Sequence, residues 1–111
     1  MRVTSSLWVG ALIRRYYGAG AIATVARRGA EEAGAIFITV DRLNGLADLY
    51  GPAPQAAFEA SRPSDRLFQR VIEGEGLDTV SSRLDKEGRF DPDLWVVAIE
   101  DREGRTLFET I

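Results

Sequence analysis

The sequence predicts a single α+β domain over residues 1–111, with two helices and a mostly antiparallel sheet of about five strands. The chain has 111 residues, of which 45% are hydrophobic, and this is the size of one core. Apolar residues recur with helical spacing in two segments, whereas in the others they alternate or form short continuous runs. Short stretches rich in glycine, proline and aspartate separate these segments. Such a mixture of elements is typical of a layered α+β fold.

The first helix is expected over residues 7–17, with hydroxyl side chains at residues 4–6 to cap its start and Gly18 and Gly20 to end it. Apolar side chains cover much of its circumference: Leu7, Trp8, Val9, Ala11, Leu12, Ile13, Tyr16 and Tyr17. This is more apolar surface than one sheet face covers, so we expect the protein to form a homodimer.

Three extended segments are expected in the first half of the chain. Residues 21–27 have an extended pattern, and residues 34–40 form the most regular strand because β-branched residues alternate there. Asn44-Gly45 predicts a hairpin turn, which makes residues 46–50 the returning strand. Residues 55–65 are expected to be irregular or to form a short helical turn.

The second half is expected to add a helix and further strands. Residues 67–72 fit a strand or a helix, and the strand is favoured. Helical spacing then predicts a helix over residues 77–88 that ends at Gly88. The turn Asp91-Pro92-Asp93 precedes residues 94–99, an apolar run typical of a central strand buried on both faces. A last strand is expected over residues 106–111.

The composition excludes several kinds of enzyme. The chain has no cysteine and no histidine. It therefore lacks disulfides, thiolate nucleophiles, Ser–His–Asp chemistry and the usual ligands of zinc and iron. The single lysine, Lys86, lies in a charged stretch that offers it no desolvated environment, so we expect no Schiff base. We expect no cofactor.

Charge and hydropathy indicate where the protein is located and what kind of partner it has. The apolar run at residues 7–13 is closed by two arginines and is too short for an export signal or a membrane helix. We therefore expect a cytoplasmic protein without membrane contact. Residues 1–30 carry five arginines and no acid, whereas the rest has nine basic and 17 acidic residues, a net charge of −8. This asymmetry indicates a charged partner.

Four stretches resemble a known family. They are Trp8-Val9 with Arg14-Arg15, Ala33-Gly34-Ala35-Ile36-Phe37, Leu49-Tyr50-Gly51-Pro52-Ala53-Pro54-Gln55, and Phe90-Asp91-Pro92-Asp93-Leu94-Trp95-Val96-Val97, which continues into Ile99-Glu100-Asp101-Arg102-Glu103-Gly104-Arg105. On these residues the chain resembles, over essentially its whole length, the domain-of-unknown-function family numbered 1491 of alphaproteobacteria. The resemblance implies a bacterial cytoplasmic protein of this size, and it implies no activity and no site residues.

One glycine motif imitates a dinucleotide site. Residues 18–23 match G-x-G-x-x-A, and Asp41 follows Gly20 by 21 residues. A dinucleotide site needs this motif after a strand and before a helix, and the predicted order is the reverse. The glycines are therefore interpreted as the end of the first helix.

The arginines are the preferred candidates for a binding site. The predicted site consists of Arg14, Arg15, Arg27, Arg28 and Tyr17. Planar guanidinium groups suit carboxylates and phosphates, and the two pairs meet near one edge if the helix packs on the strand. We expect a non-catalytic binding or regulatory module that engages an acidic protein partner. Nucleic acid is less favoured because the chain is acidic, with a pI of about 5.0.

Carboxylates support the alternative function, a small Mg²⁺-dependent or carboxylate-based enzyme on a phosphate-containing or sugar substrate. The candidates are Asp41, Asp48, Asp91, Asp93, Glu100 and Asp101. Most of these positions also suit turns, as Asp91 and Asp93 do on either side of Pro92. Trp8 and Trp95 are expected to lie in the core, and Tyr50 is expected either to rim a pocket or to cap the sheet.

Overall fold

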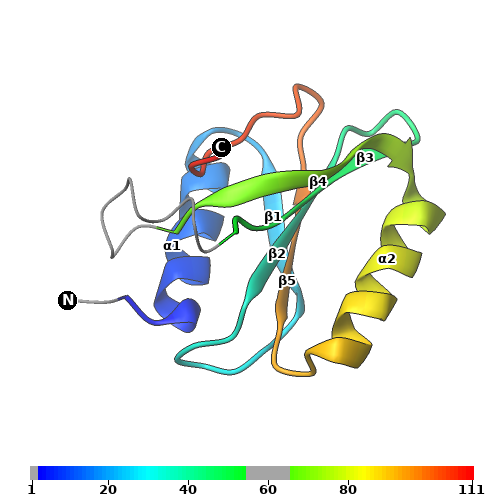
Figure 1. Cartoon of the computed structure of the whole chain (residues 1–111). Helices are drawn as coiled ribbons and strands as arrows, with labels where there is room; N and C mark the ends of the chain where they lie inside the picture. Colours follow the sequence, from blue (N-terminus) through cyan, green and yellow to red (C-terminus); the bar gives the residue numbers. More distant parts are fainter. Residues whose placement is uncertain (1–2, 55–65) are drawn as a thin grey trace.

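The structure is a computed structural model that describes residues 3–54 and 66–111 (Figure 1). Its elements, in chain order, are α1 (Ser5–Gly18), β1 (Ile22–Arg27), β2 (Ile36–Asp41), β3 (Leu46–Pro52), β4 (Phe68–Gly76), α2 (Leu77–Phe90) and β5 (Trp95–Glu100). The predicted α+β class, the two helices and the five strands are confirmed. The expectation for residues 55–65 lies outside the described residues.

The five strands form one sheet in the order β1-β5-β2-β3-β4. The pairs β1–β5, β2–β3 and β3–β4 are antiparallel, and β2–β5 is parallel. The mostly antiparallel sheet is therefore confirmed, as is the prediction that residues 94–99 form an interior strand. Residues 67–72 belong to β4, so the favoured strand is also correct.

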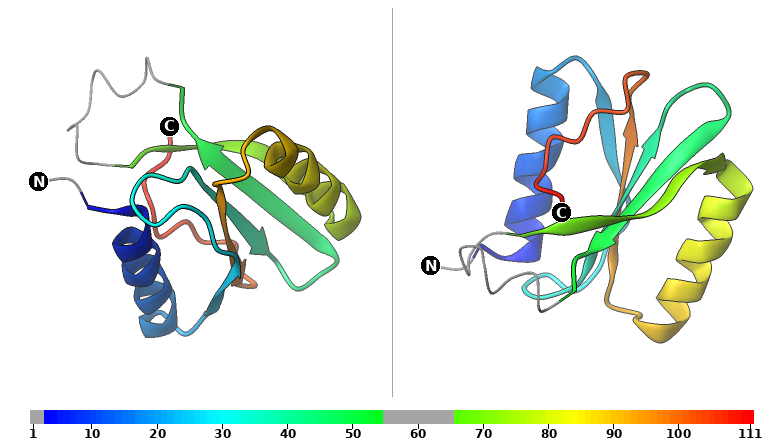
Figure 2. Two further views of the ribbon diagram at one scale, coloured as in Figure 1. Left: turned by 90° about the horizontal axis from the view of Figure 1, so that it is seen from below. Right: turned by 45° about the horizontal axis from the view of Figure 1, so that its top comes forward.

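The two helices cover opposite faces of the sheet, with α1 on one side and α2 on the other (Figure 2). β5 serves both sides because its side chains alternate. Trp95, Val97 and Ile99 join the cluster under α1, whereas Leu94 and Val96 join the cluster under α2. Each large side chain buried in this way contributes about 1.5–3 kcal/mol of transfer free energy.

Both tryptophans pack as expected in the core beneath α1. Trp95 is 1% exposed, and its indole N–H donates to the Ala30 carbonyl at 2.8 Å. Trp8 is half-buried, and its ring centroid lies 5.2 Å from that of Phe68. The apolar side chains of α1 are largely covered by the sheet and the C-terminal segment, and among the large ones only Leu7 and Tyr17 are exposed.

The ends of α1 follow the sequence signals. Thr4 is the N-cap, and its hydroxyl accepts a hydrogen bond from the Leu7 N–H at 3.2 Å. Gly20, with φ 85°, takes the left-handed conformation that turns the chain into β1.

The predicted end of α2 at Gly88 is wrong, because the helix continues to Phe90. Gly88 lies inside the helix. The guanidinium group of Arg27 lies beside it, in the space that a β-carbon at residue 88 would occupy. The close approach of Arg27, and not a chain reversal, is what this glycine permits.

The turns are close to their predictions. Around Asn44-Gly45 the chain reverses between β2 and β3, with the Arg42 N–H donating to the Leu46 carbonyl at 3.0 Å. The pairing of Arg42 with Leu46 leaves a loop of three residues, 43–45, which is one residue longer than the simplest hairpin loop. Within it, Leu43 and Gly45 have positive φ values. Asp91 and Asp93 form the expected turn, in which the Asp91 carboxylate accepts from the Asp93 N–H at 3.0 Å.

The predicted last strand over residues 106–111 is wrong. This segment crosses the α1 side of the sheet, and its only ladder contact is a single bridge between Phe68 and Thr110. Its backbone is instead held by a side chain of α1. The Tyr16 hydroxyl donates to the Arg105 carbonyl at 2.7 Å and accepts from the Leu107 N–H at 3.1 Å. Side-chain hydrogen bonds thus replace the expected strand pairing.

Candidate binding surface

The four predicted arginines lie along α1 and β1, and the structure does not bring them into one cluster. α1 packs on β1 as the prediction requires. Arg14 and Arg15 lie in the last turns of α1, next to the chain reversal into β1. Arg27 and Arg28 lie at the far end of β1. Arg27 lies five extended residue steps from Ile22, a length of about 17 Å.

The two arginines of α1 point in different directions. Successive helical residues turn by about 100°, and Tyr16 points into the core with 0% exposure. Arg15 faces the C-terminal segment, where its guanidinium donates to the Leu107 carbonyl at 2.6 Å. Tyr17 therefore lies on the other side of the helix, and it is 54% exposed. Arg14 is on the outward face, nearer to Tyr17 than to Arg15.

The two arginines at the end of β1 contact opposite layers. Arg27 pairs with Val96 in the sheet register, on the α2 face, and its guanidinium donates to the Pro92 carbonyl at 3.2 Å. Arg28 lies over the Trp95 ring, 5.2 Å from its centroid, a cation–π distance. Both guanidinium groups therefore remain at the surface, next to neutral partners.

These four arginines differ from other arginines of the chain in their neighbours. Arg42, Arg70, Arg83 and Arg105 each form an ion pair with a carboxylate. Within residues 3–54 and 66–111, no carboxylate lies within ion-pair distance of Arg14, Arg15, Arg27 or Arg28. The positive charge of α1 and β1 is therefore not neutralised by the described part of the protein.

The outer edge of β1 lies between these arginines and is open. Within the described ranges, β1 pairs with β5 alone, and five of its six residues are exposed. Ile22 is 50% exposed and Val25 is 40% exposed. This edge was not among the sequence-based predictions. Its uncharged character is nevertheless visible in the sequence, because no charged residue occurs between Arg15 and Arg27.

Four of the six carboxylates proposed for catalysis, those of Asp41, Asp48, Asp91 and Asp101, are engaged in structural contacts. Asp48, 2% exposed, accepts from the Arg42 guanidinium at 2.9 and 2.5 Å and from the Gly74 N–H at 2.8 Å. Asp41 accepts from the Leu43 N–H at 2.8 Å, within the hairpin loop. Across the described ranges, no three acidic residues gather in a group that fits a metal ion.

Asp101 anchors the start of the C-terminal segment. Its carboxylate accepts from the Arg105 side chain at 2.9 Å and from the Arg105 N–H at 3.0 Å. The hydrogen bond from the Arg105 guanidinium is the main reason that the pKa of Asp101 is lowered, and the same bond raises the pKa of Arg105. Arg105 also donates to the Ala19 carbonyl at 3.1 Å, which ties this segment to the end of α1.

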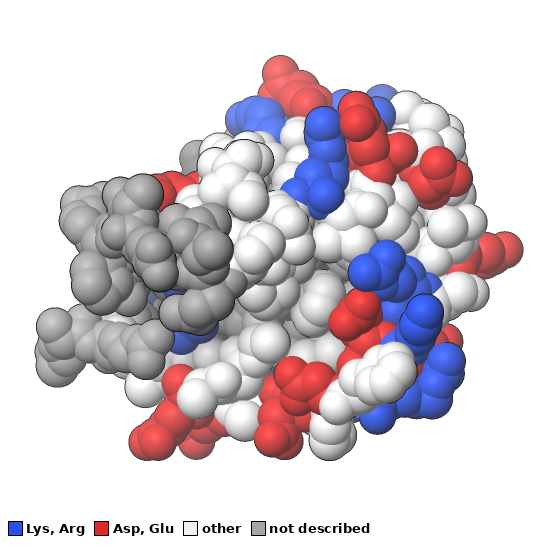
Figure 3. All heavy atoms as spheres, viewed as in Figure 1, with Lys and Arg blue, Asp and Glu red and all other residues white. Residues whose placement is uncertain are grey.

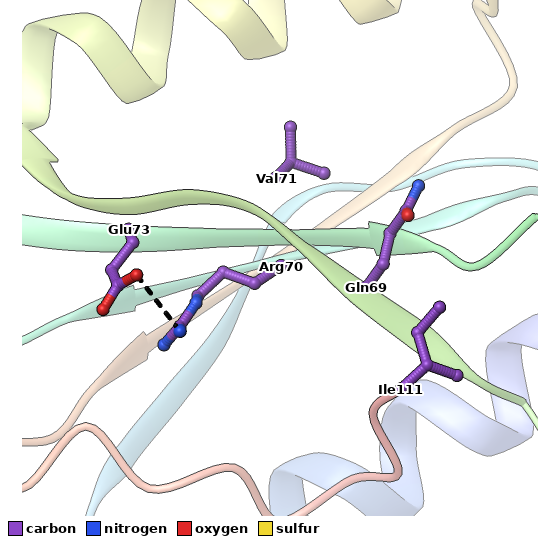
Figure 4. A pocket seen from close by; sticks show the side chains of 5 residues that line it. All are labelled: Gln69, Arg70, Val71, Glu73 and Ile111. Carbon is purple, nitrogen blue, oxygen red and sulfur yellow. Dashed lines mark ion pairs between the residues drawn. The ribbon is translucent and has the colours of Figure 1, made fainter.

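Burial raises the pKa values of the tyrosines Tyr16 and Tyr50. Tyr50 lines a polar cavity of about 320 Å³ with Arg70, Thr106 and Thr110, so its predicted place at a pocket is correct. A shallower depression of about 630 Å³ lies beside it, lined by Gln69, Arg70, Val71, Glu73 and Ile111. Figure 4 shows that Arg70 points toward Glu73, with which it pairs at 3.2 Å, whereas Val71 points to the α2 side. Arg70, the basic residue in the lining of this depression, is therefore already paired with a carboxylate, that of Glu73.

The glycine motif at residues 18–23 has the order that excludes a dinucleotide site, because it follows α1 and precedes β1. Ala19 and Gly20 line a surface depression of about 440 Å³, whose lining also includes three acidic residues, Glu100, Asp101 and Glu103, and two arginines, Arg102 and Arg105. Arg105 pairs with Asp101 at 2.9 Å, and the carboxyl end of a helix beside the other carboxylates is an unfavourable surrounding for a phosphate.

Charge on the face in Figure 3 is mixed. Basic and acidic side chains lie next to one another at the top and at the lower right of this view, and acidic side chains lie without basic neighbours along its lower edge. Ion pairs of this kind, such as Arg83–Glu87 at 2.8 Å, contribute little free energy at an exposed surface. This face has no extended basic area. In the described segments, no helix is long and apolar enough to span a membrane.

The fold and this surface define a small α+β domain that presents arginines without carboxylate partners on either side of an open sheet edge. The chain belongs to the DUF1491 family of proteins of unknown function, whose model matches residues 3–109. Comparison with curated proteins gives no match.

Two solved structures are similar to the chain over nearly its whole length. The solution structure of protein Atu0922 from A. tumefaciens is 43% identical, with a TM-score of 0.86, and the match covers 100% of this chain and 96% of that one. The crystal structure of a DUF1491 family protein from Caulobacter crescentus CB15 is 35% identical, with a TM-score of 0.81, and the coverage is 98% and 99%. Both sources are alphaproteobacteria, as the family resemblance implied.

Proposed function

We propose that the protein is a non-catalytic binding module that engages an acidic protein surface through the arginines of α1 and β1. The observation that carries this proposal is the contrast in ion pairing. Arg42, Arg70, Arg83 and Arg105 have carboxylate partners. Arg14, Arg27 and Arg28, which lie on α1 and β1, have none among the described residues, as is also the case for Arg89 and Arg102. Exposed guanidinium groups of this kind bind carboxylates with charge-assisted, bidentate hydrogen bonds.

The alternative, a carboxylate-based enzyme, has weaker support. A catalytic or metal-binding carboxylate needs free lone pairs that face a substrate. Asp48 and Asp101 use theirs on arginine and backbone N–H groups, and Asp41 and Asp91 use theirs in turns. Nucleic acid also has weaker support, because the net charge is −3 and the arginines are spread along a strand.

The test is affinity capture from native bacterial extract, with and without nuclease, with two charge-reversed variants. The test variant is Arg14→Glu with Arg27→Glu. The control is Arg70→Glu with Lys86→Glu, which makes the same charge change on β4 and α2. Equal melting temperatures for the two variants establish that both are folded.

The proposal expects one protein to be captured by the wild type and by the control, and to be lost from the test variant. Added salt should weaken this capture, since exposed ion pairs are screened. Capture of the same protein by both variants would overturn the proposal, as would an empty capture. Capture that disappears with nuclease would assign the arginines to nucleic acid instead.

A further inference from the structure

The outer edge of β1 extends the proposed function, on which this inference rests. We propose that the acidic partner binds as an extended strand added to β1, with acidic side chains directed at Arg14 on one side and at Arg27 and Arg28 on the other. Strand addition of this type uses the free backbone N–H and C=O groups of a sheet edge.

The two edges of the sheet are protected to very different degrees. β4 carries three charged side chains, Arg70, Glu73 and Glu75, and two register shifts against β3. The C-terminal residues also hydrogen-bond to its start, since the Phe68 N–H donates to the Glu109 carbonyl at 3.0 Å and the Ile111 N–H donates to the Phe68 carbonyl at 2.9 Å. Charges, irregular register and coverage are the usual means by which proteins prevent edge pairing.

β1 has almost none of this protection. Residues 22–26 are Ile, Ala, Thr, Val and Ala, without charge or proline. The single register shift lies at the end of the strand, between Val25 and Arg27. β-Branched residues are well suited to pair with a further strand.

Charge determines the kind of strand that fits. Ile22 is paired with Glu100, so that carboxylate lies on the α2 face beside the first residue of β1 and repels an acid placed there. On the α1 side, the start of β1 follows the last turns of α1, which carry Arg14 and Tyr17, and α1 packs on β1. Arg27, at the other end, is on the α2 face.

The complementary partner therefore carries two acidic residues on opposite faces of one strand. Residues i and i+n of a strand point to opposite faces when n is odd. The pairs i, i+3 and i, i+5 fit within the length of β1, about 17 Å from Ile22 to Arg27. Between the acids, apolar and β-branched residues match Ile22, Thr24 and Val25. A second copy of this chain is less suitable, because its own β1 has no acidic residue.

The test is titration of the isotope-labelled protein with a capped hexapeptide, Glu-Val-Thr-Val-Thr-Glu, followed by NMR chemical shifts. One control peptide has lysine in place of both glutamates. Two further control peptides retain the glutamates and have N-methyl groups on alternate residues, one isomer for each edge of the peptide, which removes the hydrogen-bond donors of that edge without changing charge. The probe is also titrated into the Arg14→Glu, Arg27→Glu protein.

Strand addition expects millimolar or tighter binding, shifts concentrated in residues 22–27, and at least tenfold weaker binding of whichever N-methyl peptide blocks the paired edge. The lysine peptide should not bind. Equal binding of the probe and both N-methyl isomers, with loss in the Arg14→Glu, Arg27→Glu protein, would overturn strand addition and leave the acidic-partner proposal standing. Absence of shifts in β1 would overturn strand addition. Shifts in β1 on dilution of the protein alone would assign the edge to a second copy.

Discussion

Removal of the Tyr16 hydroxyl should loosen the C-terminal segment from α1. In Tyr16→Phe the ring keeps its buried position, and only the two hydrogen bonds to Arg105 and Leu107 are lost. A buried hydrogen bond contributes about 1 kcal/mol net, so the expected loss is about 2 kcal/mol. For a domain of this size, that corresponds to a decrease in melting temperature of roughly 6–14 °C.

Denaturant unfolding and amide hydrogen exchange measure this effect. The free energy of unfolding should fall by about 2 kcal/mol, and exchange at Leu107 should accelerate more than exchange in β5. Tyr17→Phe is the matched control, because Tyr17 is the next residue of α1, is 54% exposed, and does not hold the C-terminal segment. It should change stability by less than about 0.5 kcal/mol. Equal stabilities of the two variants would refute the assigned role of Tyr16.

Three other changes test the packing and the ion pairs. Gly34→Ala should destabilise by about 1–3 kcal/mol, because its β-carbon would overlap the Asp93 carbonyl and lie 2.9 Å from Trp95; Gly18→Ala, with open space around it, should melt near the wild-type temperature. Asp48→Ala should lower the free energy of unfolding by about 2–3 kcal/mol, because Arg42 and the Gly74 N–H lose their buried acceptor; an unchanged denaturation midpoint would contradict this. Since the folded-state pKa of Asp101 is lowered, its contribution is complete above its ordinary pKa near 3.8 and is lost as pH falls through the lower folded value. The stability difference between wild type and Asp101→Asn should therefore shrink on acidification in that range, and a difference that is constant with pH would exclude the ion pair as its source.

Elements with one dominant pattern were predictable from the sequence. The alternation in β2 and the apolar run of β5 each fit one structure, and both positions are correct. The segment after Asp101 has a strand-like pattern too, yet its polar backbone groups pair with the side chains of Asp101, Arg15 and Tyr16, and the last two lie far away in the sequence. Pairing with side chains leaves no periodic signal, so the false strand at residues 106–111 could not have been recognised.

The arginines of the candidate surface can be named from the sequence, whereas their arrangement differs from the expectation. The two pairs were expected to meet near one edge if the helix packed on the strand, and the helix does pack on it. A helix rises 1.5 Å per residue and a strand about 3.3 Å, so Arg27 travels much farther from the turn at Gly20 than Arg14 does. This difference in rise leaves the open edge of β1 between them. The homodimer stays a prediction, although α1 exposes less apolar surface than its sequence indicated.

The position of β5 has a consequence for how the chain folds. The last strand in sequence lies between the first two, so β1 gains its only partner, and β2 its second, when residues 95–100 arrive. Contacts between residues so distant in sequence carry a large loop-closure cost and make folding slow. A nascent chain that stops before Trp95 keeps the apolar surfaces of β1 and β2 open to aggregation. The fold is therefore completed from its interior, and its two halves become one sheet only at the end.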